Sequence, residues 1–110
     1  MKDFQKIISF LIVTLLFVFS SFRSEALIFQ SVASGNFNTL IWNQPGLYPT
    51  TGDTVVINTG TTVTIVGFNT DVLGSVTINS GGNLTIANNA VAQLIFAGDL
   101  VVSGTLINNG

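Results

Sequence analysis

Residues 55–65 have the sequence VVINTGTTVTI, and residues 76–86, 21 positions later, have the sequence VTINSGGNLTI. In both segments, large aliphatic residues alternate with threonine and other residues, which is typical of a β-strand with one buried face. Gly60 and Gly81 interrupt this alternation at the same place in the two segments. The segments are therefore two copies of one unit, which consists of a strand, a turn with glycine and a second strand.

A third, imperfect copy spans residues 100–106, and its shorter turn places Leu106 only 22 positions after Leu84. Repeats of this length indicate a solenoid, and the leucine and asparagine spacing of leucine-rich repeats is absent. We expect residues 68–73 and 91–96, which lie between the copies, to supply a third side to each coil. The sequence thus predicts an all-β fold, a single-stranded right-handed parallel β-helix with three sides and about 21–22 residues per coil.

Seven short strands are expected in this region. They span residues 54–57, 62–65, 75–78, 83–86, 93–96, 100–102 and 105–107. Strands of successive coils stack about 4.8 Å apart, so equivalent aliphatic side chains should form internal columns. The predicted core residues are Val55, Ile57, Val63, Ile65, Val76, Ile78, Leu84, Ile86, Leu100, Val102 and Leu106.

One corner of the predicted coil carries asparagine in two successive copies, at Asn58 and Asn79. Asparagine tolerates left-handed backbone better than most residues, and its amide can stack on the amide of the next coil. We therefore expect these two side chains to lie one above the other.

The segment before the repeats, residues 27–52, differs from them in composition. It contains four aromatic residues, Phe29, Phe37, Trp42 and Tyr48. An open end of a β-helix exposes apolar core and unpaired strand edges, and terminal repeats of solenoids are usually atypical caps. We therefore interpret this segment as an N-terminal cap in which Trp42 and Tyr48 cover the first coil; the alternative is that the two rings form a platform on which a sugar stacks. The coils occupy residues 53–110, which amounts to fewer than three coils and stops within a repeat.

The first 26 residues have the three parts of a secretory signal peptide. Lys2 and Lys6 form a basic start, residues 7–19 form an uncharged and mostly apolar run, and Ser24 and Ala26 are small residues at the positions that a signal peptidase recognises. The apolar run of 13 residues is shorter than the roughly 20 that a membrane-spanning helix needs. Cleavage after Ala26 and export are therefore predicted, with no transmembrane segment left after cleavage.

Removal of the signal peptide changes the charge of the chain. Lys2, Lys6 and Arg23 leave with it, and the remaining charged residues are three aspartates, which give residues 27–110 a net charge of −3. Without lysine or arginine this part cannot neutralise phosphates, which argues against nucleic-acid binding and disfavours electrostatic docking to anionic lipids. Cysteine is absent, so packing and backbone pairing must hold the exported chain together.

Several classes of catalytic and metal site are excluded by composition. Histidine and cysteine are both absent, which rules out Ser-His-Asp and Cys-His sites and leaves no typical ligand set for zinc. Asp53 lies between Gly52 and a strand, where its carboxylate is expected to cap turn amides. Asp71 and Asp99 are weak calcium candidates, since calcium prefers oxygen ligands, but the interpretation favoured for both is a solvated turn. We therefore assign no catalytic residue and no cofactor.

The repeats and the segment before them resemble a family of bacterial proteins. Gly35-Asn36-Phe37, Trp42, Pro49-Thr50-Thr51-Gly52-Asp53, Gly60 and the strands around them resemble the start of large β-helical surface proteins of Gram-negative bacteria, many of which use the type nine secretion route. Phe37 stands where that family often has tryptophan. The chain is also similar to the extracellular domain named for its eight conserved glycines. The resemblance implies a β-helix at the cell surface.

Two functions follow as hypotheses. In the favoured one, the chain is the N-terminal part of a secreted or surface-exposed, adhesin-like scaffold, without catalysis in this segment, whose parent contacts glycans or neighbouring cells along its stacked faces. In the alternative, it begins a polysaccharide lyase or glycoside hydrolase whose paired carboxylates lie beyond residue 110.

Overall fold

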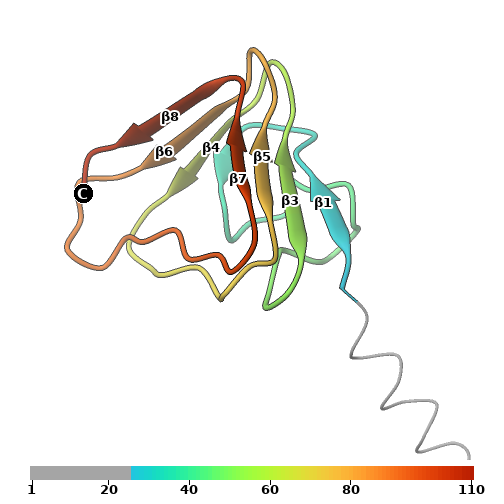
Figure 1. The fold of residues 1–110 in the computed structure, drawn as a ribbon, viewed down its shortest axis with the longest axis horizontal. Coiled ribbons are helices and arrows are strands. Elements are labelled where there is room, and N and C mark those ends of the chain that lie inside the picture. Colours follow the sequence, from blue (N-terminus) through green and yellow to red (C-terminus); the bar gives the residue numbers. More distant parts are fainter. Residues whose placement is uncertain (1–25) are drawn as a thin grey trace, which may run out of the picture.

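Eight strands form two parallel sheets in the computed structural model, which describes residues 26–110 (Figure 1). The strands are β1 (Ile28–Gln30), β2 (Gly35–Asn36), β3 (Thr54–Ile57), β4 (Thr62–Ile65), β5 (Val76–Ile78), β6 (Asn83–Ile86), β7 (Leu100–Val102) and β8 (Thr105–Asn108). Residues 1–25 of the predicted signal peptide lie outside the described part. Within residues 26–110 there is no helix long and apolar enough to cross a membrane.

The two sheets have the strand orders β1-β3-β5-β7 and β2-β4-β6-β8, and every neighbouring pair is parallel. Each strand therefore pairs with the equivalent strand of the next coil, and Figure 1 shows the odd-numbered strands side by side along one side of the molecule. This arrangement is a solenoid of about four coils, which confirms the predicted parallel β-helix.

The register of the sheets stacks equivalent residues of successive coils. Ile57 pairs with Ile78 and Ile78 with Val102, while Val63, Leu84 and Leu106 follow one another in the second sheet. The inner columns are buried through the middle coils, where Val55, Ile57, Val63, Ile65, Val76, Ile78 and Leu84 are all 0% exposed. In the last coil they are not: Val102 is 44% exposed, and Leu100 and Leu106 are only partly buried, because no described coil covers them.

Most of the predicted strands lie where the alternation of residues placed them. The strands expected at residues 54–57, 62–65, 83–86 and 100–102 have these bounds in the structure. β5 begins one residue later than predicted, at Val76, and β8 ends one residue later, at Asn108. Alternation with a fixed period therefore predicted the strands of both sheets in the repeats.

The interpretation of residues 27–52 as a cap alone is wrong, because this segment also builds the first coil. β1 pairs with β3 and β2 pairs with β4, both in parallel. The expectation of fewer than three coils is wrong for the same reason. Two features hid the first coil in the sequence. Its columns contain Ser31 beside Ile57 and Gly35 beside Val63, where later coils have aliphatic residues. In addition, Gly35 precedes Val63 by 28 residues, whereas equivalent residues of the next two coils are 21 apart.

Part of the segment still caps the solenoid. The chain returns along the free edge of β1, where Val32 donates to the carbonyl of Ile41 and Asn43 donates to that of Gln30, at 2.8 and 2.9 Å. These antiparallel bonds occupy a strand edge that would otherwise be open to other chains. Trp42, in the middle of this stretch, is 4% exposed and thus covers the first coil.

The third side of the coil is irregular, and the strand predicted at residues 93–96 does not form. Only two isolated bridges link this side between coils, Asn69 to Gln93 and Leu73 to Phe96. Asn69 and Leu73 are four residues apart, but their bridge partners Gln93 and Phe96 are only three apart. A regular ladder therefore cannot continue from one bridge to the other. Thr70 fills the gap, because the amide of Ile95 donates to its hydroxyl at 2.8 Å instead of to a carbonyl.

The corner between the two sheets depends on glycine. Gly60 and Gly81 have φ values of 83° and 80°, in the left-handed region that glycine enters without steric cost. Asn58 and Asn79 lie one above the other as expected, with the amide of Asn79 donating to Oδ1 of Asn58 at 3.3 Å. Neither asparagine has left-handed backbone, since every described residue with positive φ is a glycine, and that part of the expectation is wrong.

The same corner requires glycine for a second reason, which is close packing of the coils. A Cβ atom on Gly82 would lie 2.7 Å from the carbonyl oxygen of Ile57, in the preceding coil. The amide of Gly82 also donates to the carbonyl of Asn79 at 2.8 Å. A side chain at this position would therefore push two coils apart at the point where their backbones meet.

Replacing Ile78 by aspartate should unfold the protein, whereas replacing its neighbour Thr77 by aspartate should be tolerated. Ile78 is fully buried in its column, and a carboxyl group buried there without a partner costs several kcal/mol, which is comparable with the whole stability of a typical small domain, about 5–15 kcal/mol. Thr77 points outward and is partly exposed. Circular dichroism during thermal unfolding measures both, and equal effects would contradict the register.

Replacing Gly82 by alanine should destabilise the protein by about 1–3 kcal/mol, the usual cost of an inserted methyl group in a close-packed site. The matched control is Ser80→Ala, which changes an exposed residue of the same corner. Chemical denaturation of both variants measures the difference. A Gly82→Ala variant as stable as the control would show that the coils can separate at this corner without cost.

Candidate functional site

The three aspartates of residues 27–110 differ in burial and in the contacts that they make. Asp53 is 5% exposed, and its Oδ2 accepts bonds from the backbone amide and the hydroxyl of Thr50, at 2.9 and 3.2 Å. Its Oδ1 accepts a bond from the backbone nitrogen of Leu27 at 2.9 Å. Asp53 thus holds the turn before β3 and also ties the start of the described chain to it.

Asp71 and Asp99, the calcium candidates, are both exposed. They do not combine with other acids, since residues 26–110 contain no group of three acidic side chains placed to hold a metal ion. The backbone amide of Asp99 donates to Oγ of Ser75 at 3.2 Å, which fixes its turn without use of the carboxylate. Among the described residues, neither aspartate therefore belongs to a cluster of acidic side chains.

Trp42 and Tyr48, which were expected to cap the coil together, have different environments. Trp42 is buried, its Nε1 donates to the carbonyl of Phe37 at 2.9 Å, and its ring packs edge-on against Phe29 and Phe37. Tyr48 is 49% exposed, so it does not cover the apolar end. The buried aromatic cluster of Phe29, Phe37 and Trp42 does so instead, and the Tyr48 ring is left at the surface.

Tyr48 lines a hollow of about 160 Å³ on the third side of the solenoid, which we call the Tyr48 hollow. The first coil contributes Asn38 and Pro49 to its lining, and the second coil contributes Asn69 and Asp71. Phe37, Phe68 and Thr70 complete it. The Phe37 and Phe68 rings, with centroids 6.2 Å apart, form a packed aromatic pair among the lining residues.

The lining of the Tyr48 hollow combines two kinds of contact. Amides of Asn38 and Asn69 both donate and accept hydrogen bonds, and an ionised Asp71 carboxylate accepts them. The tyrosine ring offers an apolar face beside these groups. An aromatic face next to paired donors and acceptors suits a ligand with hydroxyls on its rim and an apolar C–H face, which is the chemistry of a sugar ring. The volume is below the roughly 300–1,000 Å³ of sites for drug-sized ligands, as expected for one ring.

Rows of uncharged polar side chains run across the outside of the second sheet. Thr64 pairs with Thr85 in register, and Thr62 pairs with Asn83 beside them. The amide of Asn83 donates to the Thr62 hydroxyl at 3.4 Å, so side chains of neighbouring coils contact each other along a row. These rows match the stacked faces expected from the sequence and provide repeated hydroxyl and amide groups.

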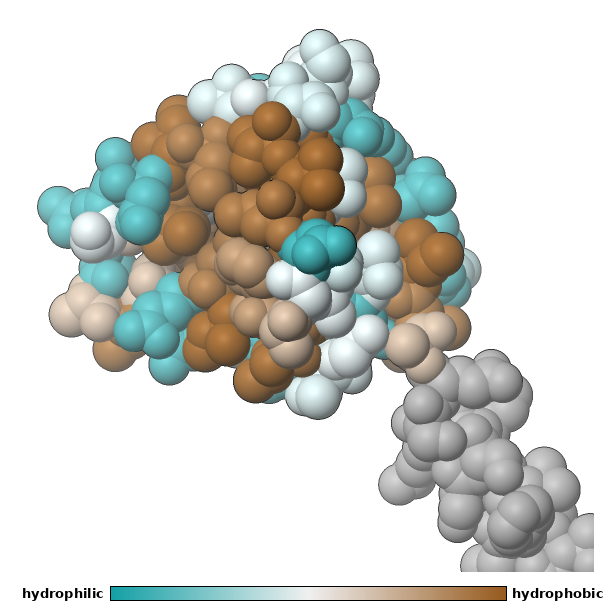
Figure 2. All heavy atoms as spheres, viewed as in Figure 1, coloured by the Kyte–Doolittle hydropathy of each residue, from teal (hydrophilic) through white to brown (hydrophobic). Residues whose placement is uncertain are grey.

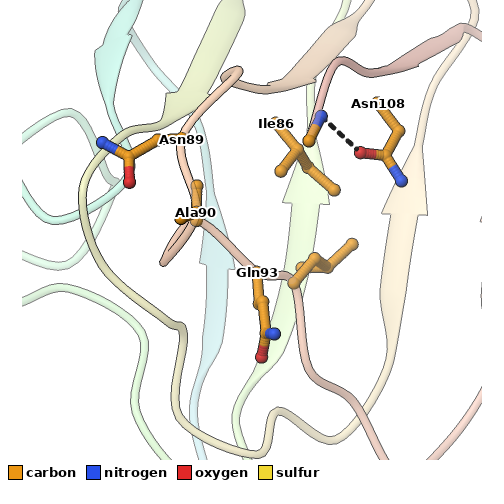
Figure 3. Close-up of a pocket in the computed structure, with 8 residues that line it drawn as sticks. Ile86, Asn89, Ala90, Gln93 and Asn108 are labelled. Carbon is orange, nitrogen blue, oxygen red and sulfur yellow. Dashed lines mark hydrogen bonds between the residues drawn. The ribbon is translucent and has the colours of Figure 1, made fainter.

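A larger cavity of about 350 Å³ lies beside the last coil (Figure 3). Ile86 lies between Asn89 and Ala90 of the following loop and Asn108 of β8, whose Oδ1 accepts a bond from the Gly110 amide at 3.1 Å. Asn108 pairs with Ile86 and therefore continues an inner column. This cavity is thus continuous with the interior of the last described coil, and it lacks the exposed aromatic ring found in the Tyr48 hollow.

Apolar side chains gather on the face that ends in β7 and β8, as Figure 2 shows. Val101, Val102 and Ile107 are 49%, 44% and 41% exposed there. Leu94 and Phe96 of the third side are partly buried and pack against the core from the same coil. On this face lie the last described residues of the stacked columns and the strand edges of β7 and β8.

Sequence reasoning did not identify Asn38, Asn69 and Phe68 as neighbours of Tyr48. None of them lies in a repeated position, and the third side on which they meet has no regular register. The signals available were the exposed turn residues Asn69 to Asp71 and the aromatic residues before the repeats, but nothing in the spacing places them together.

Comparison of the chain with models of protein families, with curated proteins and with solved structures finds no match. The resemblance to exported β-helical surface proteins therefore stays a prediction from the residues that carry it.

Proposed function

We propose that this chain is part of an exported, non-catalytic β-helix that acts as a surface scaffold and contacts neutral glycans. The observation that carries the proposal is the in-register stacking of about four coils, which aligns the outward side chains of successive strands in rows along the axis, such as the row of Thr62, Asn83 and Thr105. Such a body grows in length without changing its cross-section, and it presents a long surface for weak, repeated contacts.

The Tyr48 hollow supports glycans as the partner. Tyr48, Asn38, Asn69 and Asp71 line a space of about 160 Å³, and their side chains are of the kinds that contact sugar rings. The Thr62 and Thr64 rows on the neighbouring sheet offer further hydroxyls to an extended chain. Charge favours neutral over acidic glycans, because residues 27–110 contain three aspartates and no lysine, arginine or histidine to pair with a uronate or sulfate.

Export should depend on the apolar run of the signal peptide. Leu15→Arg places a charge within residues 7–19 and should keep the protein inside the cell, whereas Ser9→Ala preserves the run and should leave export unchanged. Fractionation of a Gram-negative host that expresses the whole chain, followed by immunoblotting, measures both. Equal export of the two variants would count against a signal peptide.

Glycan binding should depend on Tyr48. In affinity electrophoresis, gels that contain a neutral polysaccharide should slow the migration of the exported protein more than gels that contain a polyuronate. Tyr48→Ala should weaken this binding about threefold to tenfold, since an aromatic contact contributes about 0.5–1.5 kcal/mol. The control is Leu40→Ala, which removes a side chain that is 70% exposed and does not line the hollow.

Two results would overturn the glycan assignment. One is equal binding by Tyr48→Ala and the unaltered protein, which would place the contact elsewhere. The other is preference for acidic polysaccharides, which the charge of the chain opposes.

A further inference from the structure

Two hydrogen bonds, one at the backbone nitrogen and one at the carbonyl oxygen, hold Leu27 against the start of β3. Its backbone nitrogen donates to Oδ1 of Asp53 at 2.9 Å, and its carbonyl accepts a bond from the amide of Thr54 at 2.9 Å. Asp53 itself is nearly inaccessible, at 5% exposure, and its other oxygen is occupied by Thr50. The Leu27 nitrogen therefore has a fixed position beside a buried carboxylate.

This nitrogen is also the atom that signal-peptide cleavage after Ala26 would release. Hydrolysis by a signal peptidase breaks the C–N bond between Ala26 and Leu27 and uses one water. The water oxygen joins the carbonyl carbon of Ala26, which leaves as a carboxylate, and the nitrogen of Leu27 becomes an amine that is protonated at neutral pH. A neutral peptide N–H at 2.9 Å from Asp53 is thereby replaced by a positively charged ammonium group.

The charge is unusual in this chain, because no other cationic group remains. Every lysine and arginine precedes residue 27, and histidine is absent. The α-ammonium group of Leu27 is then the sole cationic group of residues 27–110, and the carboxylate that it meets is buried. A hydrogen bond with one ionised partner is already stronger than a neutral one, and a positive charge on the donor adds direct attraction between opposite charges.

We infer that removal of the signal peptide creates an ion pair between the Leu27 α-ammonium group and the Asp53 carboxylate, which fastens the first coil to the turn before β3. The inference rests on the proposed export in one respect, the cleavage after Ala26. Maturation then stabilises the fold: in the precursor a neutral N–H donates to the Asp53 carboxylate, and in the mature chain the donor also carries a positive charge. Asp53 acts as a positioning residue for the new N-terminus.

The test uses the absence of lysine after residue 26, which leaves the α-amine as the single amine of the mature protein. Intact mass spectrometry of the exported chain should show that it begins at Leu27. Acetylation of this amine with an N-hydroxysuccinimide ester, checked by the gain of one acetyl group, removes its charge. Acetylation should lower the midpoint of thermal unfolding by roughly 4–8 °C, the usual shift for a loss of one moderately strong interaction in a domain of this size.

Variants of the aspartates show whether Asp53 is the partner. Asp53→Asn keeps the shape of the side chain and an acceptor oxygen but removes the charge. Acetylation of this variant should lower its unfolding midpoint by less than about 2 °C, which is the size of effect expected for an exposed terminus. Asp71→Asn is the matched control, since Asp71 is exposed, and acetylation should shift it as much as the unaltered chain. An equal shift in all three proteins would overturn the ion pair.

A second comparison covers the case in which Asp53→Asn does not fold. A chain that retains Ala26 before Leu27 carries its ammonium group one residue farther from Asp53. It should unfold at a lower temperature than the chain that begins at Leu27, and acetylation should change it little. Equal stability of the two chains would overturn the inference, as would an exported chain that begins at another residue.

These outcomes are separate from those for the proposed function. The chain that begins at Leu27 can also be released from a fusion protein by a protease that leaves no extra residue. Coupling between Leu27 and Asp53 is then measured without export or glycan binding. If the protein binds no glycan, the inferred ion pair is unaffected. If acetylation does not change the unfolding midpoint, the proposed scaffold function is unaffected.

Discussion

Parallel backbone pairing between successive coils is the constraint on which this structure depends. A strand of three or four residues cannot satisfy its own amide and carbonyl groups, so each coil needs a neighbour whose strands lie in the same register. The register then stacks Ile57 on Ile78 and Val63 on Leu84, which turns a weak local alternation into continuous apolar columns. Strand pairing and core packing therefore support one another, and a shift of one residue would lose both.

The corner explains how the coils come close enough for this pairing. Gly60 and Gly81 supply the backbone angles that turn the chain from one sheet to the next, and Gly82 leaves room for the carbonyl of Ile57. The polar groups that the corner buries are also satisfied. Ser31 and Thr61 share a hydrogen bond of 2.6 Å, and no buried side-chain nitrogen or oxygen of the described residues lacks a partner.

A chain with few charges must manage polarity mostly through hydroxyls and amides. Thr70 takes over backbone bonds on the irregular third side, and asparagine and threonine form contacts between coils on the outside. Asp53 is the exception, because it places a carboxylate in a nearly inaccessible position with several donors around it. Its location joins three parts of the molecule: the beginning of the described chain, the turn at Thr50 and the start of β3.

The sequence by itself determined the β-helix, its repeat length and most strands of both sheets, because a period of 21 residues with threonine, aliphatic residues and glycine at equivalent positions has few other solutions. It could not reveal the first coil, where Ser31 and Gly35 replace aliphatic residues and the spacing lengthens. Only the tertiary structure decided that Trp42 is buried while Tyr48 is exposed, and that Asn38 and Asn69 line the same hollow as Tyr48. The hollow is lined by residues of different coils on a side without regular register, so no local pattern encodes it. The bond from Leu27 to Asp53 is of the same kind, since 26 residues separate its ends and only the closure of a coil brings them together.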